Sequence, residues 1–177
     1  MEVELPVILY FHNLKYCIDL LTQCELLLSS EKLSEEDRLL VRTAALFDCM
    51  SYLKGYNERE KYTNQLTREV LPGYHYNEKQ IEKVYKLLVI PMMPPSAMTL
   101  PGKILSDARL AFIGKNNFMD SVNKLYDEMK FYGQCSSKPE FIKNLLEYLK
   151  SFKFYTRTAQ KLVEIPIEKQ IEILTSI

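Results

Sequence analysis

Apolar residues recur every three or four positions along most of the chain. In residues 8–28 this spacing predicts an amphipathic helix with one buried face, marked by Phe11, Leu14, Ile18, Leu21 and Leu28. Alternation of apolar and polar residues, which would indicate β-strands, is nowhere sustained. The pattern therefore predicts an all-α protein.

A second helix is predicted to begin where Ser34 and Asp37 form a capping-box-like pair. Its apolar residues lie nearly all round the helix, which favours a central position: Leu39, Leu40, Thr43, Ala44, Leu46, Phe47 and Met50. Further helices are predicted over residues 58–71, 78–90, 103–112, 118–132, 140–151 and 155–165, with a short one after Pro166.

Residues 91–103 interrupt this regularity, because they hold four of the eight prolines and three of the seven methionines. Such a segment cannot form a regular helix. Two interpretations stay open. The segment is either a stiff connector between helices, or a wall or lid over a pocket, where methionine supplies an adaptable apolar surface.

Composition narrows the class of protein. With 177 residues, 47% hydrophobic and 26% charged, the chain suits one globular domain over residues 1–177. The 23 Lys and Arg balance the 23 Asp and Glu, so we expect no nucleic-acid and no membrane partner. An acidic N-terminus, and no apolar run of the roughly 20 residues that span a bilayer, predict a soluble, cytoplasmic protein.

The numbers and spacing of cysteines and histidines limit the kinds of metal site that the chain can form. No C-x-x-C pair occurs, and we expect reduced, structural thiols at Cys17, Cys24, Cys49 and Cys135. The two histidines, His12 and His75, cannot build a tris-imidazole centre, so any metal site would depend on carboxylates. His75 follows a Pro-Gly pair and is predicted to be a surface turn residue.

Two groups of polar residues stand out against the apolar pattern. His12, Tyr16 and Asp19 recur at helical spacing, so that their polar tips would share one surface. Asp48 lies in an apolar segment, where a buried carboxylate requires a cation, a network of donors or a metal. Asp107 is a second such acid, and Arg109 stands two residues further, which on a helix points it away from Asp107.

The order of five motifs, spread over residues 7–175, resembles that of the HD-domain phosphohydrolase superfamily. The motifs are Tyr10-Phe11-His12-Asn13-Leu14-Lys15-Tyr16; Ala44-Ala45-Leu46-Phe47-Asp48; Asn57-Glu58; Asp107-Ala108-Arg109-Leu110 with Ile113-Gly114; and Phe154-Tyr155-Thr156-Arg157-Thr158-Ala159. The resemblance implies an HD-type helical bundle around a metal held by a histidine, a His-Asp pair and a later aspartate. It also implies nucleotides or other phosphoesters as substrates.

The chain departs from the family pattern at the metal ligands. Tyr16 stands at the second histidine of the His-Asn-x-x-His pattern, and Phe47 replaces the histidine of the His-Asp pair. Asn57 replaces the histidine that precedes the retained Glu58, and Arg109 replaces the second acid of the Asp-Ala-Asp-Leu motif. Phenylalanine has no lone pair and a neutral phenol is a poor ligand, so the expected metal set is incomplete.

These departures predict a degenerate family member without metal-dependent hydrolysis or a cofactor, which binds a small phosphoester or nucleotide ligand, or a protein partner. Arg109 would balance the acids, and Thr156 and Arg157 are candidate phosphate contacts. One alternative is an active phosphohydrolase with a carboxylate-rich Mg²⁺ or Mn²⁺ site. Its residues would be Asp48 and Glu58 in catalysis and Asp48, Asp107 and His12 at the metal. Another alternative is a structural interaction bundle that uses the Pro-Met segment as its contact surface.

Overall fold

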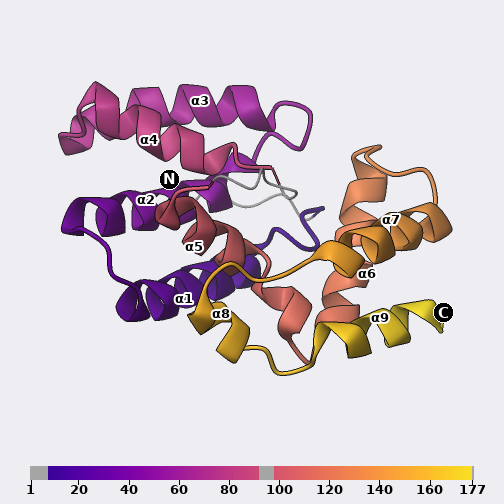
Figure 1. The fold of residues 1–177 in the computed structure, drawn as a ribbon. Coiled ribbons are helices and arrows are strands. Elements are labelled where there is room, and N and C mark those ends of the chain that lie inside the picture. Colours follow the sequence, from indigo (N-terminus) through magenta and orange to yellow (C-terminus); the bar gives the residue numbers. More distant parts are fainter. Residues whose placement is uncertain (1–7, 92–97, 177) are drawn as a thin grey trace.

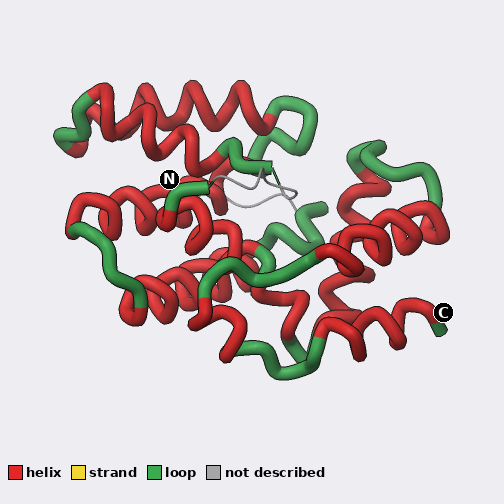
Figure 2. Tube along the Cα trace, viewed as in Figure 1, coloured by secondary structure: helices red, strands yellow, loops and turns green. Residues whose placement is uncertain are grey.

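The computed structural model describes residues 8–91 and 98–176, and over these residues it contains helices and loops but no strand (Figure 2). The prediction of an all-α protein is confirmed. The α-helices are α1 Leu14–Ser30, α2 Glu35–Ser51, α3 Arg59–Val70, α4 Glu78–Leu88, α5 Leu100–Arg109, α6 Phe118–Phe131, α7 Lys138–Ser151, α8 Arg157–Lys161 and α9 Ile167–Thr175. Two 3₁₀ turns, η1 Leu71–Tyr74 and η2 Ala111–Gly114, follow α3 and α5.

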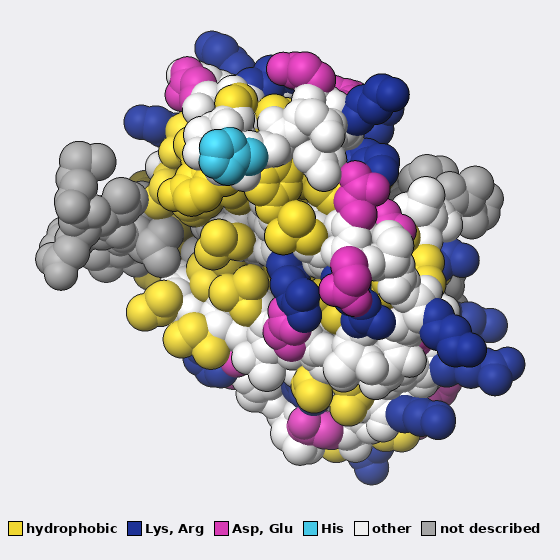
Figure 3. Space-filling model, turned by 90° about the vertical axis from the view of Figure 1, so that its left-hand side faces the viewer, with side chains coloured by type: hydrophobic (Ala, Val, Ile, Leu, Met, Phe, Trp, Pro, Cys, Tyr) yellow, Lys and Arg dark blue, Asp and Glu magenta, His cyan; other side chains and the backbone are white. Residues whose placement is uncertain are grey.

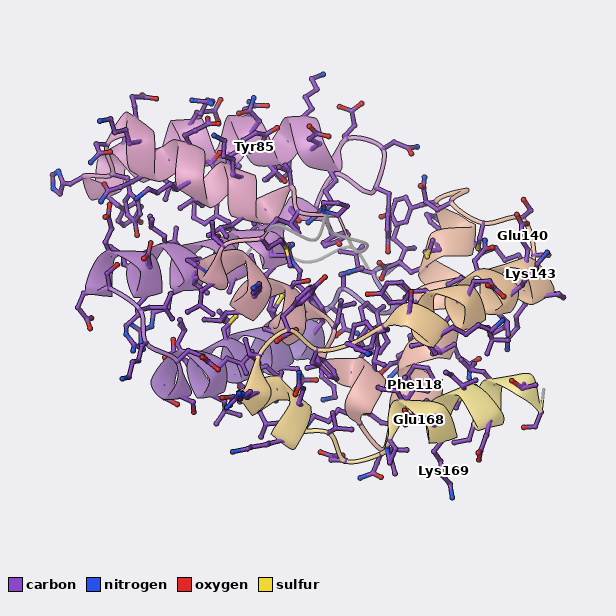
Figure 4. All side chains as sticks on the ribbon, viewed as in Figure 1. Tyr85, Phe118, Glu140, Lys143, Glu168 and Lys169 are labelled. Carbon is purple, nitrogen blue, oxygen red and sulfur yellow. The ribbon has the colours of Figure 1, made fainter. Side chains whose placement is uncertain are left out.

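The helices form two groups with separate apolar cores (Figure 1). The first group holds α1 to α5, with the α3–α4 pair at the top of the view, and its core is drawn mainly from α1, α2, α4 and α5. The second group holds η2, α6, α7 and α9, and its core includes Phe118, which lies close to α9 in Figure 4. Phe152 and Ile167 pack against both cores and join them.

Helix α2 packs against α1, α3, α4 and α5, which confirms its predicted central position. Not every apolar residue of this helix is buried, however. Leu39 and Leu46 are 46% and 50% exposed, so one stripe of α2 faces outward. The buried face, which carries Phe47 and Asp48, is the part that the site depends on.

Helix starts follow local capping chemistry. The Ser34 side chain accepts a hydrogen bond from the Asp37 amide, so α2 begins where the sequence predicted. The first helix, in contrast, begins at Leu14 and not near residue 8, because the Asn13 side chain accepts from the Tyr16 amide and caps it. His12 therefore precedes α1 and does not share a helical face with Tyr16 and Asp19, as the spacing had suggested.

The Pro-rich segment is partly helical. Thr99 caps α5, and Pro101 occupies its first turn, where the missing amide proton costs nothing. The prediction that residues 91–103 contain no regular helix is therefore wrong for residues 100–103. Residues 92–97 lie outside the described part of the chain, so the choice between connector and lid stays a prediction.

Smaller predictions concern the surface of the protein and its cysteines. Within the described residues no helix is long and apolar enough to cross a bilayer. Figure 3 shows one end of the molecule, where hydrophobic side chains gather on one side and charges of both signs are mixed on the other. Glu140 and Lys143 project from the outer side of α7 (Figure 4). His75 is exposed, and Cys17, Cys24 and Cys49 are buried free thiols, as predicted.

Candidate functional site

Asp48 forms the centre of a buried polar cluster between α1, α2, α3 and α5. Its carboxylate is fully buried. Oδ1 accepts hydrogen bonds from Nη2 of Arg59 at 2.9 Å and Nη2 of Arg109 at 2.7 Å, while Oδ2 accepts from the Tyr16 hydroxyl at 2.7 Å. The sequence alone does not show which groups pair with Asp48. In the structure, both of its carboxylate oxygens accept hydrogen bonds, from two guanidinium groups and a phenol.

The two arginines are held in place by the end of α4. Arg109 donates to the carbonyls of Leu87, Leu88 and Ile90, and Arg59 also donates to the Leu88 carbonyl. The last carbonyls of a helix lack partners within that helix and carry its negative dipole end, so they suit a cation. The guanidinium groups are therefore fixed by backbone as well as by Asp48.

The charges keep Asp48 ionised. Burial alone would raise the pKa of this carboxyl, but the nearby charges of Arg109 and Arg59 and the hydrogen bond from Tyr16 outweigh it, and hold the pKa below its usual value. Burial, together with the charge of Asp48, raises the pKa of the Tyr16 hydroxyl, so Tyr16 stays a neutral donor. The prediction that Arg109 balances an acid is confirmed for Asp48.

A second buried cluster lies beside the first and centres on Glu128 of α6. Glu128 Oε1 accepts from His12 Nδ1 at 2.5 Å and from the Tyr56 hydroxyl at 2.7 Å. Its Oε2 accepts from the backbone amides of Phe11 and His12. Burial lowers the pKa of His12 and outweighs the opposite effect of Glu128, which favours a neutral imidazole with its proton on Nδ1.

Aromatic rings connect the two clusters. The Tyr52 ring stacks on the His12 ring, with centroids 3.6 Å apart, and the Arg59 guanidinium lies 4.7 Å from the centroid of Tyr52. These residues line a cavity of about 180 Å³ together with Tyr16, Tyr56 and Arg109, and with apolar side chains from α6 and from the segments that follow α4 and α5. A more open polar cleft of about 380 Å³ shares the Tyr16 and Arg109 wall.

Asp107, the second acid that matches the family pattern, binds a different part of the chain, the segment before α8. Its Oδ1 accepts from the Tyr155 amide at 2.9 Å, and its Oδ2 accepts from the amide and the hydroxyl of Thr156, both at 2.8 Å. Thr156 in turn caps α8. Burial raises the pKa of Asp107 by more than these hydrogen bonds lower it. The hydrogen bonds of Asp107 therefore hold the C-terminal segment in place and not the Asp48 cluster.

The residues present do not fit the divalent metal that the family resemblance implies. Every carboxylate oxygen of Asp48 and Asp107 already accepts a hydrogen bond, and two of the donors at Asp48 are cations that would repel a metal ion. No group of three or more His, Cys, Asp or Glu is placed to hold a metal in the described part of the chain. His12 is engaged by Glu128 and not by either aspartate.

The remaining predicted residues lie outside this cluster. Phe47 is buried in the first core. Asn57 is exposed and accepts from Gln134, while Glu58 has a 59% exposed side chain near Lys61. Arg157 is exposed at the start of α8 and does not line the cavity beside Asp48. The structure thus brings together His12, Tyr16, Asp48 and Arg109, and separates them from the other candidates.

Four residues of the site are absent from the sequence-based predictions: Tyr52, Tyr56, Arg59 and Glu128. Glu128 carried a usable signal, because it follows Leu125 by three residues and so lies beside the apolar stripe of α6. Arg59 follows the Asn57-Glu58 motif directly, but nothing in the local pattern distinguishes it from an exposed helix-start residue.

No family model, curated protein or solved structure matches this chain.

Proposed function

We propose that this protein is a degenerate HD-type domain that binds a small anionic ligand, such as a phosphoester, and does not hydrolyse it through a metal. The observation that carries the proposal is the pair of guanidinium groups on Asp48. In the HD family this aspartate faces a metal ion. Here Arg59 and Arg109 supply positive charge in its place, beside a cavity that a ligand can enter.

The chemistry of the cavity favours an anion. Two guanidinium groups face one carboxylate in the Asp48 cluster, so a positive charge is left over at the cavity wall. The side chains of Arg59 and Arg109 remain 23% and 13% exposed, and Arg109 Nε is buried without a hydrogen-bond partner. Planar guanidinium donors suit the oxygens of phosphate and carboxylate groups. The tyrosine hydroxyls add neutral donors.

The test combines metal analysis with ligand binding. Mass spectrometry of the purified protein should find no stoichiometric divalent ion. Calorimetric titration with inorganic phosphate and with adenosine monophosphate should show binding that weakens by about tenfold or more in Arg109→Lys, which keeps the charge but loses the planar fork. Arg68→Lys is the matched control, because Arg68 pairs with Glu78 and Glu82 on the surface. One divalent ion per chain, lost in Asp48→Ala, would overturn the proposal.

The competing proposal is an active Mg²⁺- or Mn²⁺-dependent phosphohydrolase. It predicts metal-dependent phosphate release from a nucleotide panel, which should disappear in both Asp48→Ala and Asp107→Ala. The structure favours the binding function, because Asp48 and Asp107 are engaged by separate sets of donors. A wild-type protein without activity across the panel would count against the hydrolase.

A further inference from the structure

The cavity of about 180 Å³ beside Asp48 lies where the two helix groups meet, and each group contributes a different kind of wall. The first group supplies a cationic wall, formed by the guanidinium groups of Arg59 and Arg109 that meet at Asp48. The second group supplies an apolar wall, whose side chains belong to the second core or pack against it: Phe11, Phe112, Leu125 and Met129. A ligand in this cavity therefore contacts both kinds of surface.

The residues that line the cavity carry three hydrogen-bond donors without an acceptor among the described residues. Arg59 donates through Nε and Nη2, which leaves its Nη1 open. Arg109 donates through both Nη atoms, and its buried Nε is open. The Tyr52 hydroxyl is the third open donor, and burial raises its pKa to about 12, so it stays neutral. These donors suit a ligand that supplies oxygen acceptors.

The charges around the cavity favour a carboxylate over a phosphate monoester. Asp48 balances one of the two guanidinium groups, so one positive charge is left in the Asp48 cluster. A carboxylate carries one negative charge at neutral pH, whereas a phosphate monoester carries about 1.5 to 2. Uncompensated charge is costly in a buried site, and the buried Glu128 carboxylate nearby disfavours any excess of negative charge.

The volume of the cavity limits the size of the ligand. An engineered cavity of roughly 150 Å³ in another protein binds one benzene molecule. A volume of about 180 Å³ therefore suits one six-membered ring that carries a small anionic group. Acetate or inorganic phosphate would leave the apolar wall without contact. A nucleotide, with its ribose and larger base, would have to extend into the neighbouring cleft of about 380 Å³.

The side chains of the apolar wall favour a planar ring. The rings of Phe11 and Phe112 meet edge to face with centroids 5.1 Å apart, and the Tyr16 ring lies 5.4 Å from that of Phe11. Aromatic rings offer faces and edges to a further ring, and such contacts add to the gain from burying apolar area. Met129 contributes a thioether, which adapts its shape and makes favourable contacts with aromatic rings.

We propose that this cavity binds a monocyclic aromatic carboxylate, the class of which benzoate is the simplest member. The carboxylate accepts hydrogen bonds from the cationic wall, and the ring lies against Phe112, Leu125 and Met129. This inference rests on the function proposed above, because it specifies the class of anion that binds beside the Asp48 cluster.

The test is calorimetric titration of the wild-type protein with benzoate, acetate, benzyl alcohol and inorganic phosphate. Benzoate should bind at least about tenfold more tightly than acetate, which lacks the ring, and than benzyl alcohol, which lacks the charge. Phosphate should bind more weakly than benzoate. Benzoate that binds no more tightly than acetate would overturn the ligand class, and phosphate binding in the same protein would leave the proposed function standing. Equal binding of benzoate and benzyl alcohol, or no binding of any anion, would overturn both.

A second measurement places the ring in the cavity. With isotope-labelled methionine methyl groups, benzoate should shift the Met129 resonance and leave that of Met119 unchanged. Met119 is the matched control, because both methionines lie on α6 and pack against the second core, but only Met129 lines the cavity. Met129→Trp, which fills the cavity, should weaken benzoate binding at least about tenfold, and Met119→Trp should not. Benzoate that binds without shifting the Met129 resonance would overturn the proposal, and this readout needs no variant.

Discussion

Asp48 and Asp107 are both buried aspartates at positions where the family resemblance expects metal ligands, yet the fold uses them in opposite ways. Asp48 is held by the side-chain cations of Arg59 and Arg109. Asp107 is held by two backbone amides and the hydroxyl of Thr156. Accordingly, the pKa of Asp48 lies below its usual value and that of Asp107 lies above it.

This contrast shows that an acid at a motif position can have a role other than binding a metal. An ion pair makes Asp48 part of a charged cluster that lines a cavity, and the same pairing leaves no room for a divalent ion. Asp107, in contrast, accepts hydrogen bonds from backbone amides and so holds the segment before α8 in place. Retention of both acids therefore does not indicate retention of one shared metal site.

The largest expected effect comes from removing the carboxylate of Asp48. Asp48→Ala leaves two largely buried guanidinium groups without their anion, and we expect the free energy of unfolding to fall by about 3–5 kcal/mol. Urea unfolding followed by circular dichroism measures this. Glu25→Ala is the matched control, because the Glu25–Arg42 pair is half exposed, and its loss should cost less than about 1 kcal/mol. Equal effects of the two substitutions would contradict the role given to Asp48.

Asp107→Ala should have a smaller effect. It removes the acceptor of two amides and one hydroxyl but leaves no buried charge, so we expect a loss of about 1–3 kcal/mol. Because the bonds secure residues 155–156, hydrogen exchange should speed up there and in α8. Asp120→Ala, at an exposed pair with Lys124, serves as control. A loss larger than that of Asp48→Ala would reverse the comparison.

Local signals in the sequence predicted the helices and one half of the site. Periodicity located α2 to α7 to within a few residues, and the apolar context of Asp48 indicated that it needed a cation or donors. Periodicity places the start of α1 too early, because the apolar stripe continues through residues that precede the cap at Asn13. Glu128 could not be assigned to His12, since the contact joins residues 116 positions apart, and only the packing of the two helix groups brings them together.

The smallest expected effect is a difference in pH dependence, and it tests the opposite pKa directions of the two acids. For Asp48 the lowered pKa means that its contribution is complete above the unfolded value of about 3.9 and is lost as the pH falls toward the folded value. For Asp107 the raised pKa means that the folded protein binds more protons than the unfolded chain between about pH 3.9 and the folded value. Its contribution therefore falls as the pH rises through that window. Asp107→Asn removes the titration of this carboxyl, and the acceptor oxygen that it also loses lowers the stability by an amount that does not depend on pH. Urea unfolding between about pH 4 and pH 6 should therefore show the stability of the variant gaining on that of the wild type as the pH rises. A wild type that instead gains on the variant over this range would show that the hydrogen bonds from Tyr155 and Thr156 outweigh burial, and that both acids are held in their charged forms.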